Sequence, residues 1–206
     1  MLVSHKKKFI FVHIYKNAGT SIENALQAYA ASKLWRGVYH ISNNLGISKS
    51  PIKPCDQHAK ADEIRAIVGD EVYSDYFSFA FVRNPWDWQV SLYKYSLKKE
   101  DHFQHDFIQS LGSFDAYIEW RCNNEVELQK NFILADSGES LVDFIGRFEN
   151  LEDDFSKICS QLNISAKLPR LKVSNTVPYQ NYYSEFSKKL VAETYAEDID
   201  RFRYEF

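Results

Sequence analysis

Two short segments carry residue types that suit the binding of phosphate-like anions. The first spans residues 13–21 and places a lysine, small residues and two hydroxyls after an apolar run. If a helix begins in this segment, its first amides and the positive end of its dipole point toward a bound anion. The candidate ligands of one phosphate group are then Lys16, Asn17, Ala18, Gly19, Thr20 and Ser21.

The order of residues in this loop differs from that of ATP-binding loops. In the pattern G-x-x-x-x-G-K-[ST] the lysine follows the glycine, and the next hydroxyl holds Mg²⁺. Here Lys16 precedes Gly19, and no residue of the loop is arranged for a metal. We therefore predict a metal-free phosphate site. The alternative is a lysine on a surface turn, with Thr20 or Ser21 as an ordinary helix N-cap.

The second segment begins at Arg83, directly after another apolar run, and includes Ser91 eight residues further on. A guanidinium can bind a phosphate through two N–H groups, and open parallel sheets bind ligands at the carboxyl ends of their strands. The alternative is a structural arginine that caps carbonyls or pairs with Asp87. Two anion sites, each after a buried strand, indicate a ligand with phosphates at both ends of a nucleoside.

The elements that must position these residues alternate along the chain. Continuous apolar runs predict buried strands, apolar residues spaced three and four apart predict helices, and Gly69 and Asn84-Pro85 are expected to end elements. The predicted strands are 9–14, 76–82 and 141–148. The predicted helices are 22–29, 58–68, 85–97, 103–132, 151–162 and 182–202, with surface loops at 42–54 and 168–178. This alternation predicts an α/β layered fold.

Length and composition limit the class of protein. A chain of 206 residues predicts a single domain, 1–206. A net charge of −3 without a long basic block argues against nucleic-acid binding. Three cysteines without a C-x-x-C pair favour reduced thiols in a cytoplasmic protein. No stretch approaches the roughly 20 apolar residues of a membrane span, so we expect a soluble protein. The oligomeric state is not predicted.

At these residues the sequence resembles the carbohydrate sulfotransferase family, which includes heparan and chondroitin sulfate enzymes and many bacterial relatives. His13-Ile14-x-Lys16-x-Ala18-Gly19-Thr20-Ser21 is similar to the family's 5′-phosphosulfate loop, and residues 81–87 with Ser91 and Tyr93 are similar to its 3′-phosphate motif. Further similar segments are His58 with Ile64-Arg65, residues 144–151, and Asp198-Ile199 with Tyr204. The resemblance implies a P-loop-like sulfotransferase fold, with a central parallel β-sheet flanked by α-helices.

The resemblance also implies a reaction. A sulfuryl group would pass from 3′-phosphoadenosine 5′-phosphosulfate (PAPS) to a hydroxyl of a carbohydrate or other small acceptor, leaving adenosine 3′,5′-bisphosphate, without a metal. Lys16 would stabilise the leaving group, and Thr20 and Ser21 would hold the 5′-phosphate. Arg83 and Ser91 would hold the 3′-phosphate, with Lys172 and Ser174 as further donor-binding candidates. His58 is the candidate general base, because imidazole titrates near neutral pH.

Some positions depart from the family pattern, and two other functions compete. Tyr15 and Asn17 stand where relatives usually carry proline and a small or hydroxyl residue, and Trp88 stands where an arginine is common. The loop containing Val173, Asn175 and Thr176 is usually more basic. His13 is expected to be structural, and the alternative for His58 is an ordinary surface residue. The competing functions are a Mg²⁺-dependent small-molecule kinase and a non-catalytic nucleotide-binding module.

Overall fold

The computed structural model describes residues 1–30, 57–169 and 177–206. The predicted loop 42–54 and the candidates Lys172 and Ser174 lie outside the described residues. Internal contacts divide the chain into two compact units. The first comprises Met1–Val82 and Asn131–Leu171, and the second comprises Arg83–Lys130 and Lys172–Phe206. The single domain expected from the chain length stays a prediction.

A four-stranded sheet forms the centre of the first unit. Its strands, in spatial order, are β1 (Leu2–Ser4), β2 (Phe9–Val12), β3 (Phe77–Val82) and β4 (Phe144–Arg147). β2, β3 and β4 are parallel, whereas β1 pairs antiparallel with β2, so the sheet is mixed. The α/β prediction is confirmed, and the three predicted strands are present with shorter bounds. The sequence analysis missed β1, because three residues are too few for a periodic pattern.

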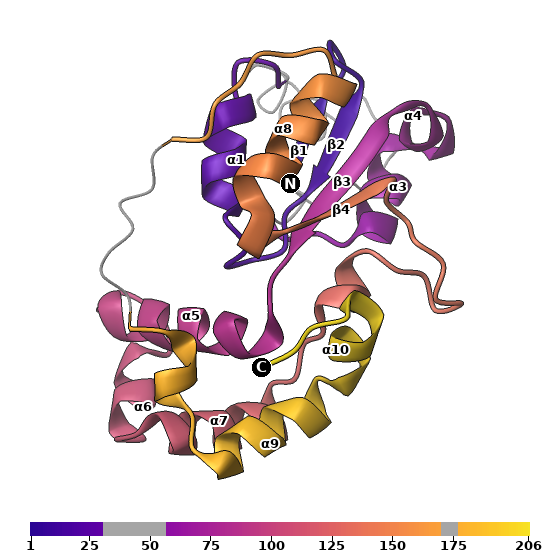
Figure 1. Ribbon diagram of the computed structural model, residues 1–206. Coiled ribbons are helices and arrows are strands. Elements are labelled where there is room, and N and C mark those ends of the chain that lie inside the picture. Colours follow the sequence, from indigo (N-terminus) through magenta and orange to yellow (C-terminus); the bar gives the residue numbers. More distant parts are fainter. Residues whose placement is uncertain (31–56, 170–176) are drawn as a thin grey trace, which may run out of the picture. The chain divides into compact units, whose positions relative to one another are not determined.

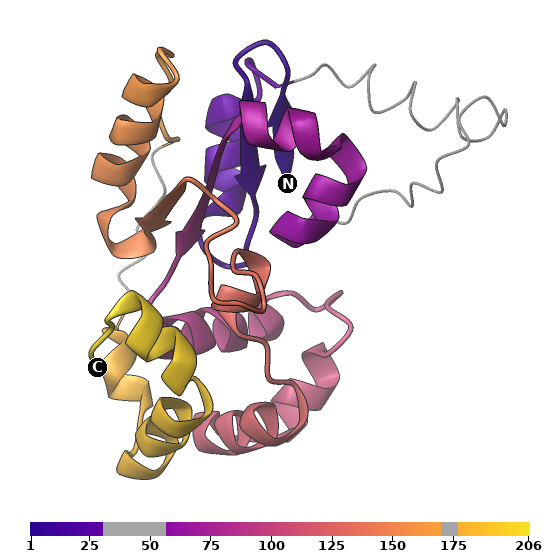
Figure 2. The same ribbon diagram turned by 90° about the vertical axis from the view of Figure 1, so that its right-hand side faces the viewer.

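Helices from the described part of the chain cover both faces of this sheet. α1 (Gly19–Leu26) and α8 (Leu151–Gln161) lie on one face, and α3 (Ala61–Val68) and α4 (Asp70–Asp75) lie on the other, in front of the strands in Figure 2 (Figures 1 and 2). Gly69 ends α3 as predicted, with a positive φ of 88° that glycine adopts without strain. The chain then enters α4, which was not predicted.

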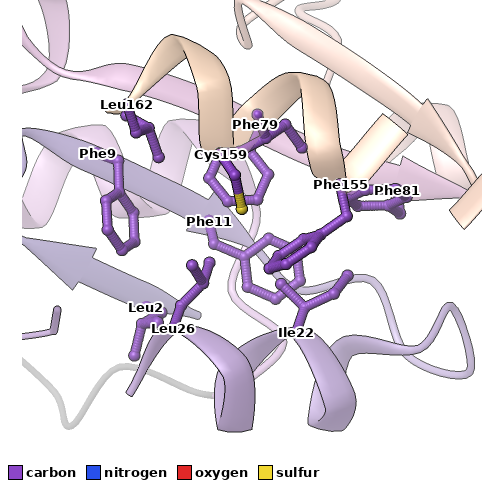
Figure 3. Close-up of a cluster of buried hydrophobic side chains, with 11 residues drawn as sticks. Leu2, Phe9, Phe11, Ile22, Leu26, Phe79, Phe81, Phe155, Cys159 and Leu162 are labelled. Carbon is purple, nitrogen blue, oxygen red and sulfur yellow. The ribbon is translucent and has the colours of Figure 1, made fainter. Parts of the chain in front are cut away.

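The core on the α1 and α8 side is aromatic. Phe9 and Phe11 of β2 and Phe79 of β3 alternate along their strands and point to this face, where the rings of Phe11 and Phe79 stack at 5.2 Å (Figure 3). Ile22 and Leu26 of α1 close the layer from one side, and Phe155 of α8 packs in the same cluster. Burying one such side chain contributes about 2–3 kcal/mol. This packing fixes the end of β2 against the start of α1.

The second unit is helical. It contains α5 (Pro85–Lys98), α6 (His105–Ser110), α7 (Phe114–Asn124), α9 (Glu185–Thr194) and α10 (Ala196–Phe202). In the two units together, the described residues also form the 3₁₀ segments η1 (Gln129–Phe132), η2 (Phe148–Asn150) and η3 (Tyr179–Tyr182). The region 103–132, predicted as helical, divides into α6, α7 and a further short segment, because Gly112 adopts a φ of 75° and Ser113 caps a new helix. The predicted helix 182–202 likewise divides, at Tyr195.

Candidate active site

The loop between β2 and α1 has an unusual backbone. Lys16 and Ala18 are non-glycine residues with left-handed φ angles of 64° and 60°. Each costs about 1–2 kcal/mol, and such strain is retained mainly at ligand-binding and catalytic segments. Ala18 is the N-cap of α1, and no described side chain caps this helix. The alternative with Thr20 or Ser21 as N-cap is therefore wrong, because both residues lie in the first turn.

The side chains of this loop differ in exposure. Thr20 is exposed, Lys16 is half-buried, and Ser21 is buried. The buried side chain of Asn17 donates a hydrogen bond to the carbonyl of Phe81 at 2.8 Å. This hydrogen bond connects the loop to β3, and Asn17 thereby helps to hold the loop in place.

His13 packs under the loop, which the sequence did not indicate. Its ring is buried, and its Nδ1 lies 3.1 Å from Oε1 of Glu23 on α1. Burial lowers the pKa of His13, so the neutral imidazole is favoured near neutral pH. A Cβ atom on Gly19 would lie 1.8 Å from Nε2 of His13. Glycine is therefore required at position 19 by the histidine, before any anion is considered.

The candidate base His58 is hydrogen-bonded to the main chain of His13, directly after the end of β2. Its Nδ1 lies 3.0 Å from the carbonyl oxygen of His13. Since a carbonyl can only accept, Nδ1 carries the hydrogen, and the lone pair of the neutral ring is on Nε2. The ring also makes edge contacts with the rings of His13 at 4.6 Å and Tyr15 at 5.8 Å. The structure thus brings His58 together with the first anion loop.

Tyr15 extends this contact toward residues that sequence reasoning missed. Its ring meets that of Phe132 edge-on at 5.8 Å, and Nζ of Lys60 lies 5.7 Å from the centre of the Phe132 ring. Tyr15, one of the departures from the family pattern, therefore contributes an aromatic wall beside His58. No sequence pattern relates Phe132 to this loop, because the contact arises from packing.

The second anion segment begins where β3 ends. Asn84 caps α5 by accepting a hydrogen bond from the amide of Trp86 at 3.1 Å, and Pro85 occupies the first helical position. Nε of Arg83 lies 2.8 Å from Oδ2 of Asp87, and their side chains are only 13% and 21% exposed. The structural pairing considered for Arg83 is therefore present. Ser91, half-buried, follows Asp87 by one helical turn on α5.

Trp88 belongs to the core of the helical unit. Its side chain is fully buried, and its ring meets that of Tyr195 edge-on at 6.3 Å. An arginine, common at this position in relatives, would place a charge in an apolar environment here. Trp88 thus serves packing in this chain.

Residues 1–30, 57–169 and 177–206 contain no group of three or more His, Cys, Asp or Glu side chains that could hold a metal ion. Among the same residues, no helix has both the length and the apolar character needed to cross a membrane.

The loop between the parallel strand β2 and the start of α1 has left-handed residues and no described side-chain cap, in a protein of the α/β class. The chain matches the model of the sulfotransferase family over residues 1–205, and it belongs to this family. It is also similar to an uncharacterized protein of Archaeoglobus fulgidus, with 30% identity over 119 residues, which cover 58% of this chain and 92% of the relative. Family membership, expected from the motifs, is confirmed and supports sulfuryl transfer as the class of reaction.

Proposed function

We propose that this protein transfers a sulfuryl group from PAPS to the hydroxyl of a carbohydrate acceptor. The observation that carries the proposal is the strained, left-handed backbone of Lys16 and Ala18 at the start of α1. Strain of this kind persists only where the surrounding structure holds it, and it clusters at ligand-binding and catalytic segments. In this proposal the amides of the first turn of α1, with Thr20 and Ser21, bind the 5′-phosphate of the donor.

Lys16 stabilises the leaving group. Sulfuryl transfer should resemble phosphoryl transfer, in which positioning and charge stabilisation supply most of the rate enhancement. As the S–O bond to the donor breaks, negative charge grows on the oxygen that bridged phosphate and sulfate. A lysine cation placed at this oxygen interacts more strongly with the transition state than with the bound donor.

His58 removes the proton from the acceptor hydroxyl as the new S–O bond forms. The hydrogen bond from Nδ1 to the carbonyl of His13 supports this role, because it selects the tautomer whose basic nitrogen is Nε2. Adenosine 3′,5′-bisphosphate leaves when transfer is complete. No step of the proposal requires a metal.

The 3′-phosphate of the donor binds at Arg83 and Ser91, with Lys172 and Ser174 as further proposed contacts. The ion pair with Asp87 holds the Nε edge of the Arg83 guanidinium and thereby restricts its orientation.

A carbohydrate acceptor and a cytoplasmic setting complete the proposal. The first rests on the resemblance of the motifs, and the second is supported by the free thiols of Cys122 and Cys159.

Calorimetric titration without added metal tests the donor. We expect adenosine 3′,5′-bisphosphate to bind at least about tenfold more tightly than ADP, a difference of about 1.4 kcal/mol. Arg83→Ala should remove this preference. Arg65→Ala is a matched control, because Nε of Arg65 also pairs with a carboxylate, that of Asp70 at 2.6 Å. Equal affinities in the wild type would reject the donor, and binding of ADP that needs Mg²⁺ would favour a kinase.

Turnover assays separate an enzyme from a binding module. Wild-type protein with PAPS should sulfate at least one member of a panel of glycans and small alcohols. Lys16→Ala should lower kcat about 100-fold or more. Tight nucleotide binding without turnover on any acceptor would favour the non-catalytic module.

A further inference from the structure

Resting on the proposed function, we infer that Gln129 and Asp198 are positioning residues that hold the main chain of Arg83 for recognition of the 3′-phosphate. Neither residue was a predicted site residue. All three belong to the second compact unit, so the inference depends on the internal geometry of that unit alone.

The side-chain amide of Gln129 binds both main-chain groups of Arg83. The N–H of Arg83 donates to Oε1 of Gln129 at 2.9 Å, and Nε2 of Gln129 donates to the carbonyl of Arg83 at 2.7 Å. This paired arrangement is the one that a neighbouring β-strand offers to a residue. Arg83 is the single residue between the last residue of β3 and the N-cap of α5, where strand pairing ends. Gln129 thus satisfies its two main-chain groups.

Asp198 in turn fixes Gln129. Its two carboxylate oxygens accept the amides of Gln129 at 2.7 Å and Lys130 at 2.9 Å. These amides begin η1, so a residue of α10 caps a helical turn that lies far from it in the sequence. Each of the two N–H donors has its own acceptor oxygen, an arrangement that a carboxylate provides and a side-chain amide does not.

Burial shows that these residues act through Arg83. The side chains of Gln129 and Asp198 are both 0% exposed. A ligand in solution therefore meets neither of them. Burying a carboxylate is unfavourable unless its charge is compensated. In Asp198 the two hydrogen bonds from main-chain amides provide this compensation. With the main chain fixed by Gln129 and Nε fixed by Asp87, the guanidinium of Arg83 has little remaining freedom.

Near-isosteric variants test this inference. Gln129→Glu keeps an acceptor for the N–H of Arg83 but places a second oxygen against its carbonyl. Asp198→Asn places an NH₂ group against one of the two amides. We expect either change to weaken binding of adenosine 3′,5′-bisphosphate about tenfold, while binding of adenosine 5′-monophosphate, which lacks the 3′-phosphate, changes less than about twofold. Loss of general structure would weaken both ligands equally.

Glu197→Gln is the matched control. It removes a carboxylate beside Asp198 in the sequence, but Glu197 is exposed and pairs with Lys130 Nζ at 2.8 Å. The affinity of the Glu197→Gln variant for both nucleotides should equal that of the wild type. Circular dichroism and thermal unfolding identify the variants that remain folded. If only one of Gln129→Glu and Asp198→Asn folds, that variant alone tests the inference.

A double-mutant cycle gives the sharpest result. In an Arg83→Ala background, Gln129→Glu should cause no further loss of affinity for adenosine 3′,5′-bisphosphate, because the guanidinium that Gln129 positions through the main chain is gone. Additive losses, or equal losses for both nucleotides, would overturn the positioning role and leave the proposed function standing. If the wild type does not distinguish the two nucleotides, the proposed function and this extension of it are both rejected.

Discussion

The imidazole of His13 occupies the space that a side chain on Gly19 would need, with Nε2 only 1.8 Å from the position of a Cβ atom. His13 directly follows the last residue of β2, and Gly19 begins α1. The same ring bonds Glu23 one turn further along α1, and its main-chain carbonyl accepts from His58. A buried histidine therefore joins the strand, the start of the helix and the candidate base.

Gly19→Ala should damage the protein through this contact. The methyl group must displace the His13 ring, and overpacking of this kind costs about 1–3 kcal/mol. Urea denaturation measures the loss. The double variant His13→Ala/Gly19→Ala should be destabilised less than the sum of its single changes, because the clash is absent. Additive losses would show that the ring is not the cause.

Lys16→Gly should separate stability from activity. The left-handed φ of 64° is unstrained for glycine, so the free energy of unfolding should rise by on the order of 1 kcal/mol while transfer is lost. Lys8→Gly is the matched control, because Lys8 also has a left-handed φ, of 49°, in the turn before β2. It should change stability in the same direction and leave transfer intact. Full turnover by Lys16→Gly would remove Lys16 from the mechanism.

Two variants of His58 separate its proposed roles. An asparagine at position 58 can still donate to the carbonyl of His13 from a position near that of Nδ1, but it has no basic nitrogen. His58→Asn should therefore retain nucleotide affinity and stability while kcat falls about 100-fold or more. His58→Gln, which places its amide further out, should lose the hydrogen bond as well as the activity. Wild-type kcat in His58→Asn would exclude His58 as the base.

Asp198 should give the folded protein a characteristic pH dependence. Burial raises its pKa from 3.8 to about 6, so the folded state holds this proton more tightly than the unfolded chain does. The raised pKa of Asp198 contributes on the order of 3 kcal/mol to the free energy of unfolding below about pH 4. This contribution is lost as the pH rises to about 6. The unfolding free energy of the wild type should therefore fall relative to that of Asp198→Asn over this range.

Chemical denaturation of both proteins between pH 4 and 7.5 measures this difference. The hydrogen bond lost in Asp198→Asn shifts its curve by an amount that does not depend on pH, and the other titrating groups are common to both proteins. Parallel curves would show that Asp198 titrates normally.

The sequence by itself determined three of the four strands of the sheet, most of the described helices and the residue types of the candidate anion loop. The apolar runs that became β2 and β3 need no partner to be recognised, because burial on both faces requires apolar side chains. Asn84 and Pro85 likewise fix the start of α5 through their own backbone and side-chain chemistry. Lys16, Gly19 and Arg83 stand out by residue type alone.

Only the tertiary structure decided which groups hold these residues in place. His58 meets His13 across 45 residues, Arg83 meets Gln129 across 46, and Gln129 meets Asp198 across 69. A buried polar side chain must find hydrogen-bond partners, but local periodicity does not say which ones. They are set by the tertiary packing within each unit. The residues of the candidate anion sites are therefore predictable from the sequence, whereas their hydrogen-bond partners are found only in the fold.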